Sequence, residues 1–122
     1  MIGYLMIGTN DLPRAEAYFD QLLGEIGAKR ATGDPGRFTA WGDGRGPMLC
    51  VTVPYDKKPA THGNGTMVAL AAGSRANVDK LYAKAISLGS ACEGAPGMRS
   101  ENFYGGYFRD LDGNKFVAFH IG

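Results

Sequence analysis

The chain has 122 residues, of which 44% are hydrophobic and 20% are charged, and its formal net charge is +1. This length and composition are typical of one soluble globular domain with its own core. The near-neutral charge gives no sign of a basic surface that would bind nucleic acid. No apolar run approaches the roughly 18 residues of a membrane span. No secretory leader follows Met1, and Cys50 and Cys92 are too few for a disulfide framework, so we expect a cytoplasmic protein.

The first half of the chain predicts one helix among four strands. Asn10 or Asp11 can cap the helix, Pro13 suits its first turn, and Gly27 suits its end, so we expect a helix over residues 12–26. Its apolar residues recur at helical spacing: Ala15, Phe19, Leu22 and Ile26. Strand-like runs separated by Gly and Pro cover residues 3–9, 28–32, 38–42 and 48–53.

The second half repeats this plan. Ser74 is a natural N-cap for a second helix that ends at Gly89. Strands are predicted over residues 66–72, 90–94, 103–109 and 115–121, with a loop over residues 95–102 and a tight turn over residues 110–114.

The two halves form an internal repeat. The step from Asp11 to Ser74 is 63 positions and the step from Gly27 to Gly89 is 62. We therefore predict an α+β fold of two βαβββ modules with helices on their outer faces. Module one covers about residues 1–54, a polar linker about 55–65, and module two about 66–122.

Four short motifs on this repeat carry a family resemblance. They are DLPRAEAYF at residues 11–19, GNGT at 63–66, PGMR at 96–99 and FRDLDGNK at 108–115. With them the whole chain resembles the vicinal oxygen chelate superfamily, which includes glyoxalase I, bleomycin-resistance proteins and extradiol dioxygenases. The resemblance implies a single domain over residues 1–122, a cup-shaped mixed sheet with the site inside the cup, and a homodimer.

The resemblance also implies where a metal would bind. The ligand positions of the metal-dependent members fall on Tyr4, Cys50, Met67 and Val117. Divalent ions of the usual kind need His nitrogen or carboxylate oxygen, and these residues offer neither. His62 lies in a polar loop, and alternation places His120 opposite Val117, so neither histidine replaces the lost ligands. We expect no metal cofactor.

Strand alternation, applied from the positions that the resemblance implies, adds Met6 to a soft and apolar lining of the cup. Trp41 at a strand end, and Arg99 and Tyr107 as polar anchors, complete the predicted pocket, which consists of Tyr4, Met6, Trp41, Cys50, Met67, Arg99, Tyr107 and Val117. Other interpretations of these lining residues stay open, both for all of them together and for Trp41 and Arg99 individually. The side chains can fill the cup as a second core, Trp41 can be a core residue, and Arg99 can either hold a ligand anion or pair with Glu93 or Glu101.

The sequence therefore favours a protein that binds a small organic molecule in an apolar cup, without metal, nucleic-acid or membrane partners. Its ligand is not identified by the sequence, and no residue is assigned a catalytic role. The alternative is a lyase, isomerase or dioxygenase-type enzyme with an unrecognised metal site or none. In that enzyme Tyr4, Arg99 and Tyr107 would carry acid–base and anion-holding roles.

Overall fold

The computed structural model describes residues 1–122, which form two helices and eight strands. The helices are α1 (Leu12–Gly24) and α2 (Arg75–Ser87). The strands are β1 (Tyr4–Gly8), β2 (Lys29–Asp34), β3 (Phe38–Gly42), β4 (Met48–Thr52), β5 (Val68–Ala71), β6 (Ala91–Met98), β7 (Phe103–Arg109) and β8 (Lys115–Ile121). No helix of the chain is long and apolar enough to cross a membrane.

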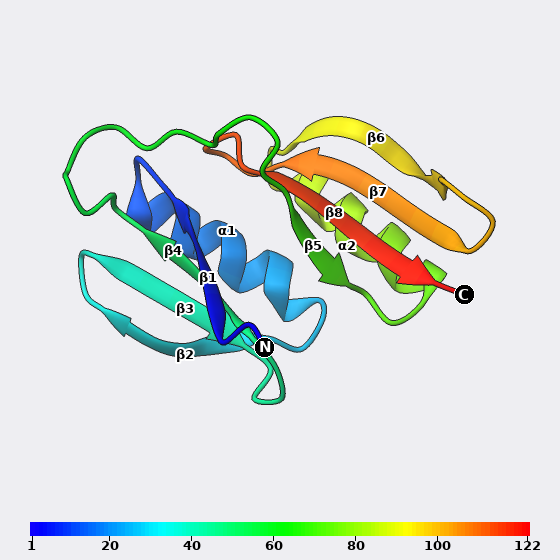
Figure 1. Cartoon of the computed structure of the whole chain (residues 1–122), viewed down its shortest axis with the longest axis horizontal. Coiled ribbons are helices and arrows are strands. Elements are labelled where there is room, and N and C mark those ends of the chain that lie inside the picture. Colours follow the sequence, from blue (N-terminus) through cyan, green and yellow to red (C-terminus); the bar gives the residue numbers. More distant parts are fainter. The chain divides into compact units, whose positions relative to one another are not determined.

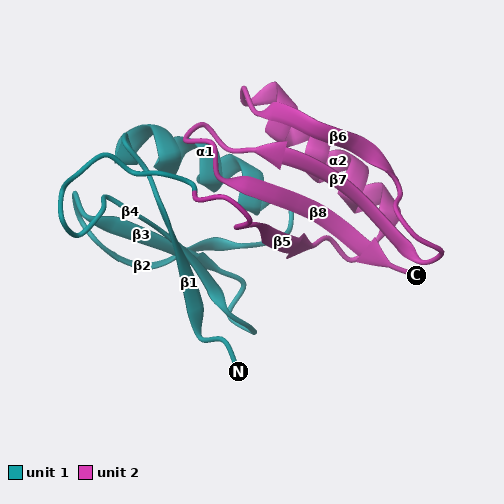
Figure 2. Ribbon diagram, turned by 45° about the horizontal axis from the view of Figure 1, so that its top comes forward, with its two compact units in different colours: residues 1–62 teal, residues 63–122 magenta.

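The chain divides into two compact units, residues 1–62 and residues 63–122 (Figure 2). Unit 1 holds a four-stranded sheet in the order β1-β4-β3-β2, and unit 2 holds one in the order β5-β8-β7-β6. In each sheet the first pair is parallel and the other two pairs are antiparallel. The predicted repeat of two βαβββ modules is confirmed, and the division falls inside the segment predicted as a linker.

The two helices begin and end with matching chemistry. The Asp11 side chain accepts a hydrogen bond from the amide of Arg14, and the Ser74 side chain accepts one from the amide of Asn77, each at 3.1 Å. Both caps satisfy amides that the first helical turn leaves without a backbone partner. At the other end, Gly27 (φ +77°) and Gly89 (φ +101°) adopt the left-handed conformation that closes a helix. Helix α1 stops two residues before its predicted end.

Each helix lies across one face of its own sheet, as Figure 1 shows for α1 and α2. The core of each unit lies between that helix and that face. Its largest fully buried side chains are Phe19, Leu22, Trp41 and Val51 in unit 1, and Val78, Leu81, Phe108 and Phe116 in unit 2. We call the opposite side of each sheet, which its own helix does not cover, the open face of that unit.

Strand β6 is longer than the sequence predicts. It runs to Met98, through Pro96 and Gly97, where a loop over residues 95–102 was expected. The pairing with β7 shifts register on either side of Gly94, so the strand is bulged rather than regular. Because β6 is the edge of its sheet, it tolerates a proline that a central strand would not.

The turn between β7 and β8 is built around one buried carboxylate. Asp110 is 5% exposed, and its side chain accepts hydrogen bonds from the amides of Asp112 and Asn114, each at 2.9 Å. The Asn114 side-chain amide donates a third, at 2.8 Å. Burial raises the pKa of Asp110, while these hydrogen bonds from Asn114 and Asp112 oppose the rise. This network fixes the turn predicted over residues 110–114.

Candidate functional site

A cavity of about 430 Å³ lies on the open face of unit 1. The residues around it come from all four strands of this sheet and from the segments beside them. They are Tyr4, Met6, Thr32, Arg37, Phe38, Met48, Cys50, Thr52, Val53 and Tyr55. Tyr4, Met6 and Cys50 are among the residues predicted to line a pocket, and the structure brings these three together.

Pairing between the parallel strands explains this gathering. Tyr4 lies beside Met48, and Met6 lies beside Cys50. Successive side chains of a strand point to opposite faces, so these four side chains share the open face. The intervening Ile7 and Val51 are buried at 8% and 0% exposure, on the face that α1 covers.

The cavity has an exposed rim and a buried floor. Tyr4 is 59% exposed and Met6 is 47% exposed, whereas Cys50 is 3% exposed. Burial raises the pKa of the Cys50 thiol, so the sulfur stays protonated at neutral pH. The charged group at the rim, Arg37, pairs with Asp34 at 3.1 Å. The cavity can therefore offer thioether, thiol and aromatic surface rather than a free charge.

Seven of the ten lining residues are not in the set predicted from the sequence, and four of them show why. Phe38 and Met48 share the open face with Cys50, and strand alternation combined with the pairing register identifies both. Arg37 belongs to the turn before β3, and Tyr55 belongs to the polar segment after β4. No periodic pattern in the sequence marks either of these two.

Trp41 does not line this cavity. It is 1% exposed, its indole Nε1 donates to Asp20 Oδ1 at 2.9 Å, and its ring lies 5.6 Å from that of Phe19. Asp20 and Phe19 both belong to α1, so Trp41 points into the core beneath the helix. Trp41 is therefore not part of the predicted lining and is a core residue, the alternative that the sequence left open.

The other four predicted residues belong to unit 2. Val117 lies on its open face between Ala69 and Tyr107 and is 1% exposed, while Met67 precedes β5 and is 45% exposed. Arg99 lies over the ring of Tyr107, with its Cζ atom 5.3 Å from the ring centroid. Tyr104 points to the opposite face, where its hydroxyl donates to Asp79 of α2 at 2.6 Å, so alternation continues through Gly105 and Gly106 without a bulge.

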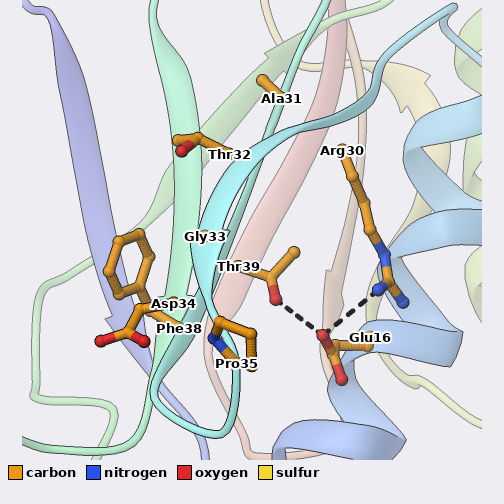
Figure 3. Close-up of a pocket in the computed structure, with 9 residues that line it drawn as sticks. All are labelled: Glu16, Arg30, Ala31, Thr32, Gly33, Asp34, Pro35, Phe38 and Thr39. Carbon is orange, nitrogen blue, oxygen red and sulfur yellow. Dashed lines mark hydrogen bonds and ion pairs between the residues drawn. The ribbon is translucent and has the colours of Figure 1, made fainter.

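A second hollow, of about 380 Å³, lies at the edge formed by β2, β3 and α1. Figure 3 shows Glu16, Arg30 and Thr39 pointing toward one another there, with Phe38 directed to the other side. Thr39 Oγ1 donates to Glu16 Oε2 at 2.7 Å, and Arg30 Nη1 lies 3.4 Å from the same oxygen. Since its charged groups satisfy one another, this hollow is a weaker candidate than the open-face cavity.

Comparison with protein families gives a match to the glyoxalase/bleomycin resistance protein/dioxygenase superfamily over residues 1–118. The chain belongs to this superfamily. Among solved structures, a glyoxalase/bleomycin resistance protein from Albidiferax ferrireducens T118 shares 34% identity, with a TM-score of 0.92, over 100% of this chain and 99% of that one.

More distant superfamily structures share the fold. A glyoxalase/bleomycin resistance protein/dioxygenase family enzyme from Burkholderia phytofirmans PsJN shares 19% identity over 98% of both chains, with a TM-score of 0.80. A lactoylglutathione lyase from Agrobacterium tumefaciens shares 22% identity over 98% of this chain and 92% of that one, with a TM-score of 0.72. The comparison with curated proteins finds no match.

The superfamily's metal chemistry can be tested against the residues of this chain. No group of three or more His, Cys, Asp or Glu side chains is arranged to hold a metal ion. At the positions implied by the resemblance, Val117 has no donor atom, Met67 offers only a neutral thioether, and Cys50 is a buried, protonated thiol. These residues do not fit a divalent ion of the usual kind.

Proposed function

We propose that this superfamily member binds a small, largely apolar organic molecule in the open-face cavity of unit 1, without a metal ion. The observation that carries the proposal is the cavity of about 430 Å³, lined by aromatic and sulfur-containing side chains around a buried thiol. Ligand pockets in proteins span roughly 300–1,000 Å³ and are mostly apolar with a few polar groups. This cavity lies in the lower half of that range, which favours a small ligand.

The shape of the lining favours a flat ligand. Tyr4, Phe38 and Tyr55 supply rings, and Met6 and Met48 supply flexible thioethers that adapt to different outlines. Thr32 and Thr52 add hydroxyl groups that can orient a ligand, although the Thr52 hydroxyl already donates to the Val53 carbonyl oxygen. Aromatic or fused-ring compounds without a net charge match this surface best.

Binding is favoured over catalysis because the lining lacks an activated group. The Cys50 thiol has a raised pKa, so little of it is present as the nucleophilic thiolate. Arg37 is engaged with Asp34, and no histidine or carboxylate is among the residues that line the cavity. The enzyme alternative would need an acid or base from outside this set. A homodimer in the cytoplasm stays a prediction.

The experiment is a titration of the purified protein with N-phenyl-1-naphthylamine, an uncharged aromatic dye that fluoresces in apolar sites. Dye emission is the readout, because Trp41 lies on the other face of the sheet and would report on the cavity poorly. We expect saturable binding of one dye per chain. Met6→Ala removes contact equivalent to about one to two buried methylene groups and is expected to weaken binding roughly four- to fifteenfold.

Met98→Ala in unit 2 is the matched control, since Met98 is 44% exposed and Met6 is 47% exposed. It is expected to leave dye binding unchanged. Cys50→Phe places a ring on the floor of the cavity and is expected to abolish binding. Dye binding that survives both Met6→Ala and Cys50→Phe in folded protein would disprove the proposed site.

A further inference from the structure

The side chain of Arg99 is held in one place on the open face of unit 2. Its Cζ atom lies 5.3 Å from the centroid of the Tyr107 ring, and its Nη2 donates to the Ala95 carbonyl oxygen at 2.6 Å. The backbone leaves room for it. A Cβ atom added at Gly94 would lie 3.1 Å from Nη2, and one added at Gly97 would lie 3.0 Å from Nη1. The two glycines of β6 therefore clear the space that the guanidinium occupies.

A second cation shares the same ring. Lys115 Nζ lies 5.6 Å from the Tyr107 centroid. Lys115 begins β8 and pairs with Arg109 of β7, so Arg109, Tyr107 and Lys115 belong to the same patch of the open face. Two cations that lie within 6 Å of one ring centroid repel each other, and a nearby anion would reduce that repulsion.

The carboxylate of this patch is already engaged. Glu93 Oε1 accepts from Arg109 Nε at 2.6 Å. Hydrogen bonding and charge from Arg109, together with the charge of Lys115, hold the pKa of Glu93 below its usual value. Arg109 also donates to the Gly113 carbonyl at 3.0 Å. Arg99 pairs with neither Glu93 nor Glu101, so no carboxylate forms an ion pair with it, while Lys115 interacts with Glu93 through its charge alone.

The guanidinium of Arg99 retains unused donors. An arginine side chain has five N–H donors in a planar fork, and Arg99 uses one of them for Ala95. A guanidinium stacked on an aromatic ring keeps its edge available, and that edge matches the two oxygens of a carboxylate or phosphate group. The arrangement therefore has the geometry of a receptor for an oxyanion.

We propose that Arg99 and Lys115, supported by the ring of Tyr107, form an anion site on the open face of unit 2. It takes the carboxylate or phosphate group of a small molecule. This site differs in chemistry from the apolar cavity of unit 1 and does not depend on the function proposed for that cavity. Arg99 supplies the planar contact, Lys115 supplies the second charge, and Gly94 and Gly97 leave room for the guanidinium.

The test is a ¹H–¹⁵N NMR titration of the whole chain with inorganic phosphate and, separately, with succinate, at ionic strength kept constant with sodium chloride. We expect saturable shifts confined to the amides of β6, β7 and the start of β8. Arg99→Gln is expected to weaken binding about tenfold or more, because charge-assisted bidentate contacts are lost. Lys115→Gln is expected to weaken it several-fold.

Matched variants separate a built site from general charge attraction. Lys80→Gln removes one exposed cation from α2 of the same unit and is expected to leave binding unchanged. Arg99→Lys keeps the charge without the planar fork and is expected to bind less tightly than the natural chain, which gives a second reading if Arg99→Gln folds poorly.

The outcomes are distinct. Shifts with phosphate alone, or with succinate alone, support the site and identify its preferred anion. An equal loss of affinity in Lys80→Gln and Arg99→Gln would overturn the proposal, as would shifts spread over the amides near every Lys and Arg. Unchanged affinity in folded Arg99→Gln would overturn it too.

Discussion

The two units share one plan but differ on the face that their own helix leaves uncovered. Both have a sheet with one parallel and two antiparallel pairs, a capped helix, and a glycine that closes the helix. On the open face of unit 1 the side chains surround a cavity with a thiol floor. On the open face of unit 2, Val117 is buried, Phe103 and Phe119 stack at 5.4 Å, and two cations share Tyr107.

This difference separates the scaffold from the site. The helix-covered faces of both units carry fully buried aliphatic and aromatic side chains, because each core must exclude water and pack densely. The open faces carry different chemistry in the two units, a cavity with a thiol floor in unit 1 and two cations over Tyr107 in unit 2. A duplicated βαβββ unit therefore keeps its stability on one face of each sheet and can vary its ligand chemistry on the other.

The largest expected effect is on stability. Replacing one phenylalanine on a helix-covered face and one on an open face tests whether the helix-covered face carries most of the folding energy. Phe116 is fully buried on the helix-covered face of unit 2, where its ring stacks on Phe108 at 5.6 Å. Phe116→Ala should lower the free energy of unfolding by about 3–5 kcal/mol. Phe38→Ala removes a ring of the same size from the partly exposed cavity lining of unit 1 and should cost about half of that or less.

Urea unfolding followed by circular dichroism measures both values. Equal losses for the two variants would mean that the open face of unit 1 carries core energy, contrary to the separation described above. Tyr104→Phe serves as a control for unit 2, since it deletes one exposed hydroxyl and keeps the ring.

The two cysteines give the next largest difference. Cys92 of unit 2 is exposed, whereas Cys50 of unit 1 is buried and has a raised pKa. A thiol reagent such as iodoacetamide should modify Cys92 at least roughly tenfold faster than Cys50 at pH 7.5, because only the accessible thiolate reacts. Mass spectrometry of peptides quantifies each site. Saturation with the aromatic dye should slow Cys50 further and leave Cys92 unaffected; equal slowing at both sites would place the dye elsewhere.

Much of the fold could be predicted from the sequence, because strand bounds and helix starts depend on residues that are close together in the chain. The bounds of β3, β7 and β8 match the predicted runs, and both helix starts follow from cap chemistry. The predicted strand over residues 90–94 is shorter than β6, because Pro96 and Gly97 are typical of loops. An edge strand with a bulge accommodates both residues.

The site was less predictable because it depends on tertiary contacts. Trp41 lies on the side of the sheet where its indole donates to Asp20 of α1, which is 21 residues away in the chain. Phe38 joins the cavity through the pairing of β3 with β4, a register that the sequence of either strand alone does not determine. Tyr55 follows β4 in a segment without periodicity.

Asp11 and Ser74 cap the two helices in the same way, so removing each cap tests whether the two units depend equally on it. Asp11→Ala and Ser74→Ala each remove one side-chain hydrogen bond of 3.1 Å to a first-turn amide. Each should lower the free energy of unfolding by about 1 kcal/mol, measured by urea unfolding. Asp11→Asn and Ser74→Thr keep an acceptor and should recover most of the loss. A cost confined to one unit would show that only one of the two helices depends on its cap.

The smallest expected effect is a dependence on pH from the Asp20–Arg30 pair of unit 1. Arg30 holds the pKa of the Asp20 carboxyl below its usual value through a hydrogen bond of 2.9 Å, and the Trp41 indole lowers it further. A carboxyl whose pKa is lower in the folded state stabilises that state above its unfolded pKa, near 4. This stabilisation is lost as the pH falls through the folded pKa. Because the Asp20 side chain is 42% exposed, solvent screens the pair, and the contribution should be about 0.2–1 kcal/mol.

Asp20→Asn keeps the size of the side chain and removes the titrating group. Urea unfolding followed by Trp41 fluorescence reports on unit 1, since Trp41 is the only tryptophan and contacts this carboxylate. The natural chain should lose more stability between pH 6 and pH 3 than Asp20→Asn does. Asp79→Asn, on the helix of unit 2, is the control and should keep the natural pH dependence of the Trp41 signal. If Asp20→Asn matched the natural chain across this range, the Asp20–Arg30 pair would add nothing to the stability of unit 1. The difference between the units would then lie in their open faces alone.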